Sequence, residues 1–233
     1  QWLERKTDAL MDRTAPRPLP GGRLREAEVL RFATATLAAG LGVLWLAVNV
    51  ETALLGLLTW TLYVWVYTPL KTRTCLNTAV GAVAGAMPIL IGWAAVRLPG
   101  ESWLNVRMLS LFTLVFLWQF PHFMAIAWLY RKQYGSAGLK MLPVVDATGR
   151  RAGIQAFLAA ALLLPISLLP VLGGSDLGAL LFAVTALLLG AGQLACALWF
   201  LTRRNDHAAR RLLQASLVYL PLLFLLLVCV SWR

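Results

Sequence analysis

The sequence predicts an all-α membrane protein, a polytopic bundle of about seven spanning helices. Of its 233 residues, 60% are hydrophobic and 13% are charged, which is about half the charged fraction of a soluble domain. Long apolar runs recur along the chain. Because unpaired backbone groups are not tolerated in lipid, runs of this length must form helices. Most of the charges lie between the runs.

Seven apolar stretches are long enough to cross a hydrocarbon core of about 30 Å. We expect spanning helices near residues 29–50, 52–69, 76–96, 108–130, 152–172, 177–202 and 212–232. A transmembrane β-barrel would need shorter, alternating segments, and the sequence contains none. The three cysteines form no C-x-x-C pair, so we expect neither a disulfide framework nor a zinc site.

Lysine and arginine are distributed unevenly between the two ends of the predicted bundle. If residues 1–28 are cytoplasmic, 18 of the 21 fall on the inner side, as the positive-inside rule requires. The formal net charge of +11 is therefore explained by the orientation of the helices in the membrane, and we expect no nucleic-acid partner. The polar segments 1–25, 67–77 and 118–146 all fall on that side, which predicts a site built from several loops on one face.

Glu4 and Asp8 are the first candidate site residues, and Asp12 continues their stripe. On a helix this four-residue spacing puts the carboxylates on one face, with about 6 Å between β-carbons. A divalent cation such as Mg²⁺ relieves their repulsion and bridges carboxylates to substrate phosphates. Arg13 and Arg17 follow, and guanidinium groups match phosphate oxygens. From spacing alone, a solvated juxtamembrane helix is the commoner explanation.

A polar notch, residues 118–123, interrupts the fourth apolar run. His122 lies eight residues before Tyr130, about 12 Å below the helix end. Ionisable residues at this depth usually face the bundle interior and carry function. Pro121 breaks the backbone hydrogen-bond ladder and opens room for a ligand. The alternative is a kinked helix whose histidine is satisfied by a neighbouring backbone or hydroxyl group.

These segments resemble, in order, the motifs of the heme O synthases (protoheme IX farnesyltransferases), a branch of the UbiA prenyltransferase family. The stretch from Glu4 to Pro20 is similar to the first acidic motif, with Glu4 and Asp8 at its two Asp positions. Residues 67–77 resemble Y-T-x-x-L-K-R-x-T-x-x-N, residues 118–123 resemble W-x-P-P-H-F, and residues 134–145 resemble D-Y-x-x-A-G-x-x-M-L-P-V-V without its Asp. The resemblance covers nearly the whole chain.

Several positions depart from the family pattern. Glu4 replaces an Asp, Thr72 stands where an Arg is usual, and Gln133 occupies the Asp position of the second acidic loop. Gln133 supplies no charge for a second metal ion. The chain also starts inside the first motif, and family members have nine spanning helices. We therefore expect a single UbiA-type domain, residues 1–233, that lacks the first helix and most of the second.

The resemblance implies Mg²⁺-dependent transfer of farnesyl from farnesyl diphosphate to the 2-vinyl group of protoheme IX (heme B), giving heme O. Heme B is then a substrate, and Mg²⁺ is the expected cofactor. Glu4 and Asp8 are expected to bind the metal and to act in catalysis with Lys71. The expected diphosphate contacts are Arg13, Arg17, Lys71, Arg131 and Lys132. The expected acceptor pocket contains Tyr67, Asn77, Trp118, Gln119 and His122.

Three roles stay open for His122, because its spacing does not choose among them: contact with the porphyrin, orientation of the propionates, or ligation of the iron. The resemblance also implies a multi-pass protein of the bacterial inner membrane, with the motif loops on the cytoplasmic side. Beyond the lipid bilayer, the implied partners are heme A synthase or cytochrome oxidase assembly factors.

Three alternatives are kept. One is another UbiA-type prenyltransferase with an aromatic or tetrapyrrole acceptor. Another is a non-catalytic transporter or scaffold, although a transporter predicts ionisable residues along a path across the bilayer and here they gather at one face. The third is that a chain lacking these helices is inactive, whatever its parent does.

Overall fold

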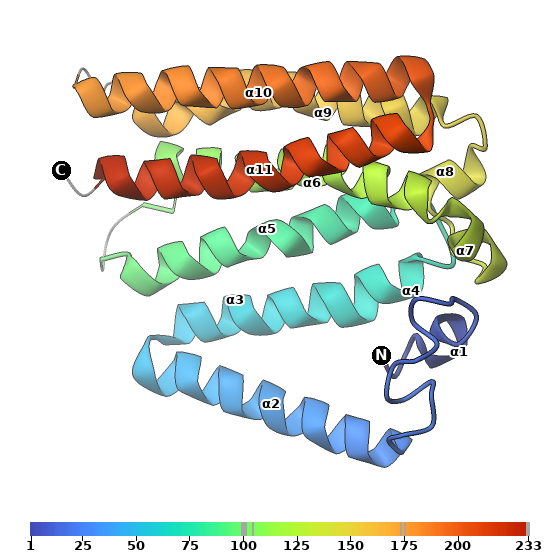
Figure 1. Ribbon diagram of the computed structural model, residues 1–233. Coiled ribbons are helices and arrows are strands. Elements are labelled where there is room, and N and C mark those ends of the chain that lie inside the picture. The colour runs from blue at the N-terminus through green and yellow to red at the C-terminus, as the bar shows by residue number, and fades with distance from the viewer. Residues whose placement is uncertain (99–101, 104, 173, 175, 232–233) are drawn as a thin grey trace. The chain divides into compact units, whose positions relative to one another are not determined.

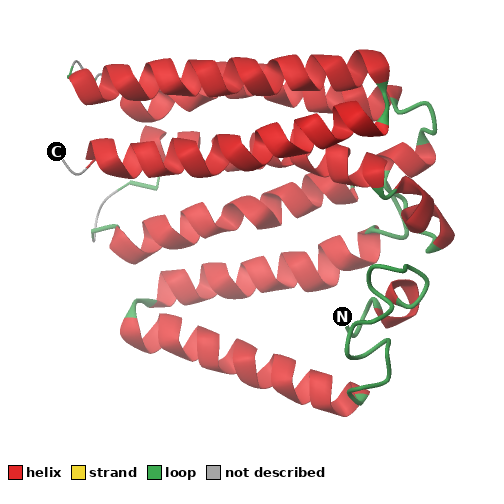
Figure 2. Cartoon of the chain, in the orientation of Figure 1, coloured by secondary structure: helices red, strands yellow, loops and turns green. Residues whose placement is uncertain are grey.

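The computed structural model describes residues 1–98, 102–103, 105–172, 174 and 176–231. Every regular element in these residues is helical (Figures 1 and 2). Within these described ranges, seven helices are long and apolar enough to span a membrane, and they run Glu26–Ala47, Val50–Leu70, Asn77–Val96, Val106–Leu129, Arg150–Val171, Leu177–Arg203 and Asp206–Val230. Each predicted span overlaps one of them, so the all-α membrane class is confirmed, with shifted bounds.

The contacts of the described residues group into two compact units. Unit 1 is made of Gln1–Glu101 and Tyr130–Val145, and unit 2 of Ser102–Leu129 and Asp146–Arg233. The three polar segments of the sequence are therefore divided between the units: the first two, and residues 130–145 of the third, belong to unit 1. The notch at residues 118–123 belongs to unit 2.

Unit 1 contains a row of packed long helices together with several short helices. Its elements are α1 (Arg5–Asp8), α2 (Glu26–Ala47), α3 (Val50–Thr61), the π-helix η1 (Leu62–Tyr67), α4 (Thr68–Leu70), α5 (Asn77–Val96), α7 (Arg131–Ser136) and α8 (Leu142–Val145). Helix α2 packs on α3, and α3 with η1 packs on α5 (Figure 1). None of the α2 residues is buried, as expected of an apolar helix that faces lipid.

Asn49 starts α3 and ties it to the end of α5. Its side-chain oxygen accepts hydrogen bonds from the amide and the hydroxyl of Thr52, both at 2.8 Å, which satisfies an amide that would otherwise be unpaired at the helix start. Its amide nitrogen donates to the Ala94 carbonyl at 2.8 Å. This one side chain therefore joins the start of the second span to the end of the third.

The π-helix η1 interrupts the second span directly before Pro69. Proline has no amide hydrogen, and its ring clashes with the carbonyl four residues back. The backbone instead turns more widely, and both the amide and the hydroxyl of Thr68 donate to the Tyr63 carbonyl. Such insertions change which side chains share a helix face and are frequent at functional sites.

Unit 2 is a ring of four long helices, α6 (Val106–Leu129), α9 (Arg150–Leu168, extended by η2, Leu169–Val171), α10 (Leu177–Arg203) and α11 (Asp206–Ser231). Helix α9 contacts α6 and α10, and α11 contacts the same two helices. Small residues allow this close packing. A β-carbon added to Gly153 of α9 would lie 2.9 Å from the Cα atom of Leu201 in α10.

Candidate diphosphate and metal site

Glu4 and Lys71 form an ion pair in unit 1. The Lys71 Nζ atom lies 2.8 Å from the Glu4 carboxylate, and the two side chains are only 12% and 22% exposed. Limited contact with water strengthens their attraction relative to a pair in bulk solvent. The bond joins the N-terminal segment to the segment after α4, two of the three polar segments that the sequence predicts on one face.

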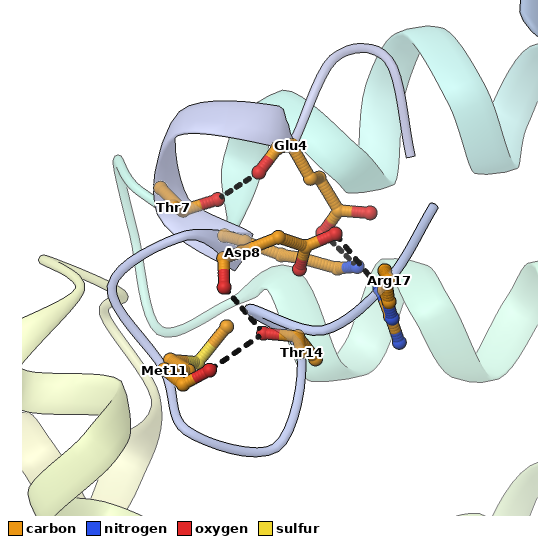
Figure 3. Close-up of polar contacts among 7 residues, drawn as sticks. Glu4, Thr7, Asp8, Met11, Thr14 and Arg17 are labelled. Atoms are coloured by element: carbon orange, nitrogen blue, oxygen red, sulfur yellow. Dashed lines mark hydrogen bonds and ion pairs between the residues drawn. The ribbon is translucent and has the colours of Figure 1, made fainter. Parts of the chain in front are cut away.

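Asp8 is paired with Arg17. The Arg17 guanidinium donates to the Asp8 carboxylate at 2.8 Å, and the Asp8 side chain is 4% exposed. Figure 3 shows Glu4 and Asp8 on the same side of their short helix, with Arg17 approaching from the returning chain. Both predicted metal-binding carboxylates are therefore held together, and each is neutralised by a predicted phosphate-binding cation.

Thr14 closes the loop that carries Asp8. Its hydroxyl donates to the Asp8 carbonyl at 2.8 Å and lies 3.4 Å from the Met11 carbonyl (Figure 3). Thr14 and Met11 are buried, so the turn has its own small core. This local folding brings Arg17 back to Asp8 at the end of α1.

The Lys71 ammonium also lies over two tyrosine rings, 4.4 Å from the centroid of Tyr67 and 5.8 Å from that of Tyr63. Cation–π attraction favours this position. Tyr67 in turn packs against Gly81 of α5, where an added β-carbon would lie 2.7 Å from the ring. Tyr63 was not among the predicted site residues, although Tyr63, Tyr67 and Lys71 follow one another at four-residue spacing.

Asn77 connects two loops of the site. It is fully buried, and its amide nitrogen donates to the carbonyls of Thr74 at 2.6 Å and Lys140 at 3.0 Å. The Lys140 amide donates to the Lys71 carbonyl at 2.6 Å. The third polar segment is thereby bound to the backbone of Lys71. Its contact with an acceptor stays a prediction.

Arg13 lies beside two tyrosines of the third segment. Its guanidinium carbon is 4.8 Å from the centroid of the Tyr130 ring. Burial raises the pKa of the Tyr134 hydroxyl, and the nearby Arg13 charge acts in the opposite direction. Arg131 and Lys132 begin α7 directly after Tyr130; Arg131 is half-buried and Lys132 is exposed. Four predicted phosphate-binding residues, Arg13, Lys71, Arg131 and Lys132, thus lie on or against segments that contact one another.

A cavity of about 400 Å³ opens beside Glu4. It is bounded by Trp2 of the N-terminal segment, by α2 residues such as Leu37, and by Trp60 and Tyr63 of the second span. Its lining is mainly apolar. One wall is formed by residues 1–4, directly before α1, so a charged group held at Glu4 lies beside a mainly apolar cavity fit for hydrocarbon.

The family model of the UbiA prenyltransferases matches residues 1–230. This chain belongs to the UbiA prenyltransferase family.

Curated relatives within this family include "Protoheme IX farnesyltransferase" of Solibacter usitatus, 45% identical over 96% of this chain and 75% of the relative. The proteins of the same name from Rhodopirellula baltica and Salinibacter ruber are each 41% identical, covering 97% and 99% of this chain and 80% and 79% of theirs. A solved structure described as digeranylgeranylglyceryl phosphate synthase in membranes has a TM-score of 0.72 at 16% identity, over 99% of this chain and 78% of that one. That likeness confirms the UbiA fold.

The residues of this UbiA chain fit a Mg²⁺ ion held partly by its substrate. Glu4 and Asp8 are the carboxylates at the site, and Gln133 adds no charge. Within the described ranges, no group of three or more His, Cys, Asp and Glu residues is placed to hold a metal. Magnesium commonly takes one or two carboxylates together with substrate phosphates and water. A pair of carboxylates flanked by cations suits this way of binding magnesium. The described residues do not form a metal site made of protein ligands alone.

The other predicted acceptor residues of this UbiA chain lie on α6 in unit 2. Gln119 is buried, and its amide nitrogen donates to the Val115 carbonyl at 3.2 Å. The indole nitrogen of Trp118 donates to the Ser216 carbonyl at 2.7 Å. The ring of His122 stacks on Trp118, with 4.9 Å between centroids. Ser216 was not among the predicted site residues, because no spacing rule connects it to His122.

Proposed function

We propose that this chain transfers a farnesyl group from farnesyl diphosphate to the 2-vinyl group of protoheme IX, forming heme O in a Mg²⁺-dependent reaction. The carbon–oxygen bond to diphosphate breaks, and a carbon–carbon bond forms at the terminal vinyl carbon. Water adds to the neighbouring carbon, and a proton is released. The products are heme O and diphosphate. The proposal rests on the family relationship, on relatives that carry this name, and above all on the Glu4–Lys71 pair.

In this proposal, Lys71 and Arg17 exchange their ion-pair partners when substrate binds. Before binding, they neutralise Glu4 and Asp8 at 2.8 Å. Glu4 and Asp8 would hold the metal ion, and Lys71 and Arg17, released from these carboxylates, would bind the phosphate oxygens. When bound, Mg²⁺ adds positive charge to the leaving diphosphate, where charge builds up as the bond breaks.

The apolar cavity beside Glu4 has a part in the same proposal. Burial of a farnesyl chain is favourable by about 0.8 kcal/mol for each methylene removed from water. Exclusion of water also protects an allylic cation from early capture. Arg13 and the α7 residues Arg131 and Lys132 supply further positive charge toward diphosphate. We place the reaction in the bacterial inner membrane, with these loops on the cytoplasmic side and heme A synthase as a downstream partner.

The test is heme analysis of membranes that contain the chain. The full chain is expressed in a bacterial host without heme O synthesis, and extracted hemes are separated and identified by mass. We expect heme O to form when farnesyl diphosphate, heme B and Mg²⁺ are supplied, and to disappear when a chelator removes the metal. Recovery of unmodified heme B alone would contradict the proposal. Formation of a prenylated aromatic acid instead of heme O would show that the acceptor is an aromatic acid and not protoheme IX.

A further inference from the structure

Ser216 of α11 contacts two neighbouring side chains of α6 in unit 2. Its backbone carbonyl accepts the indole N–H of Trp118 at 2.7 Å. Its hydroxyl oxygen lies 2.9 Å from Nδ1 of His122. Ser216 itself is fully buried. One residue therefore fixes both members of the stacked Trp118–His122 pair.

The hydroxyl of Ser216 has one proton, and that proton is already used. Its oxygen lies 2.7 Å from the carbonyl of Leu213, one turn earlier in the same helix. Two oxygens at this distance without a hydrogen between them would repel, so the hydroxyl donates to Leu213. It must then accept at its contact with His122. The proton of that second bond therefore resides on Nδ1 of the imidazole.

A neutral imidazole has a proton on one nitrogen and a lone pair on the other. With the proton on Nδ1, the lone pair of His122 lies on Nε2. Nε2 makes no hydrogen bond within the described part of the chain, and the side chain is partly exposed. The stacked ring of Trp118 and the edge of Phe123, whose centroid is 5.6 Å away, fix the plane of the imidazole. The lone pair is therefore both free and oriented.

We infer that Ser216 is a positioning residue that presents Nε2 of His122 as a ligand for the iron of a tetrapyrrole. The inference rests on the proposed function, because that function supplies an iron tetrapyrrole as the acceptor substrate. Histidines that bind metals commonly donate their second nitrogen to an oxygen, which sets the tautomer and the ring orientation. The Ser216 hydroxyl is such an oxygen. Of the three roles left open for His122, the hydrogen-bond pattern selects iron ligation.

The experiment measures tetrapyrrole binding without farnesyl diphosphate. The purified full chain in lipid nanodiscs is titrated with ferric protoheme IX and, separately, with metal-free protoporphyrin IX. Visible absorption and EPR spectra report nitrogen ligation of the iron, and porphyrin fluorescence reports binding of the metal-free ring. Variants are Ser216→Ala and His122→Ala. Their matched controls are Ser167→Ala, a fully buried serine that donates to the carbonyl of Leu164 at 2.9 Å, and His207→Ala, the chain's other histidine.

We expect His122→Ala to lose the spectrum of nitrogen-ligated iron and added imidazole to restore it. Ser216→Ala should weaken protoheme binding about tenfold, the usual scale for loss of a group that orients a metal ligand. Binding of metal-free protoporphyrin should change little in either variant, which separates loss of ligation from misfolding. Both control variants should retain the wild-type spectrum and affinity.

Two results would overturn the inference. One is wild-type protoheme affinity and spectrum in Ser216→Ala; the other is an equal loss in Ser167→Ala. Failure of the proposed function is separable, because binding is measured without turnover. If the iron is ligated but no heme O forms, the proposed function is wrong. If heme O forms without ligation by His122, only this inference is wrong.

Discussion

Lys71 and Glu4 are 67 positions apart in the sequence, yet their charged groups lie 2.8 Å apart in the structure. The pair is mostly shielded from water and lies beside a mainly apolar cavity that Glu4 helps to line. It connects the start of the short helix α1 to the end of a membrane span. A diphosphate that entered this site would meet an ammonium group already positioned beside a carboxylate. A substitution of either residue therefore tests the same ion pair.

The first prediction concerns Lys71. Lys71→Gln should raise the KM for farnesyl diphosphate by about 10- to 150-fold, because a hydrogen bond to a charged group contributes about 1.5–3 kcal/mol. Steady-state kinetics at varied farnesyl diphosphate measures the effect. The control is Arg73→Gln, since Arg73 is an exposed cation two residues away. Equal effects at both positions would show that only the general positive charge of the loop matters.

The second prediction separates Asp8 from Asp12. Asp8 is buried and paired with Arg17, whereas Asp12 is exposed. Asp8→Asn removes a metal-binding charge and should lower kcat by about 100-fold, since each 1.4 kcal/mol of lost transition-state stabilisation is a factor of ten. Asp12→Asn should retain nearly full turnover. The measurement is the rate at increasing Mg²⁺. If the Asp8 variant responded to Mg²⁺ like the wild-type chain, Asp8 would have no place in the site.

The third prediction tests the support behind Lys71. In Gly81→Ala the added β-carbon would lie 2.7 Å from the Tyr67 ring, so the ring must move away from the ammonium it underlies. Overpacking of this kind costs about 1–3 kcal/mol. We expect the KM for farnesyl diphosphate to rise several-fold.

Gly92→Ala is the matched control for Gly81→Ala, because it lies in the same helix and its added β-carbon has nothing within 4 Å. This variant should show wild-type kinetics. If both variants showed the same KM, packing of Tyr67 would not position Lys71.

The sequence predicts the spans, and the segments that form the candidate site, better than the pairings between side chains. Apolar runs suffice for the seven helices, since a span depends on length and composition. The four-residue spacing of Glu4 and Asp8 correctly predicts a shared helix face. The pairing of Glu4 with Lys71, and of Asp8 with Arg17, depends on how the chain returns through Thr14 and on the packing of distant helices. No local pattern contains that information.

Two further features show why local patterns are insufficient. The π-helix before Pro69 alters the face on which Tyr63 and Tyr67 lie, whereas a regular helical period assumes an unbroken ladder. Ser216 contacts His122 across 94 positions, and a serine in an apolar run looks like a small packing residue. In both cases the contact arises from an element that the sequence signals only weakly.

The last prediction concerns two buried glutamines of unit 2 that differ in hydrogen bonding. Gln193 in α10 is 1% exposed, and neither its amide nitrogen nor its amide oxygen has a partner in the described structure. Gln119 in α6 is also buried, at 4% exposed, but its amide nitrogen donates to the Val115 carbonyl. An unsatisfied buried amide costs about 1–3 kcal/mol.

Gln193→Met should therefore raise the midpoint of thermal unfolding in detergent by about 2–4 °C for each kcal/mol recovered, since methionine keeps the volume and removes the polar atoms. Gln119→Met should leave the midpoint unchanged or lower it, because it breaks an existing bond. Tryptophan fluorescence on heating measures both. A midpoint that falls equally in the two variants would mean that the Gln193 amide is satisfied in the folded protein, and that α10 is held by a polar contact.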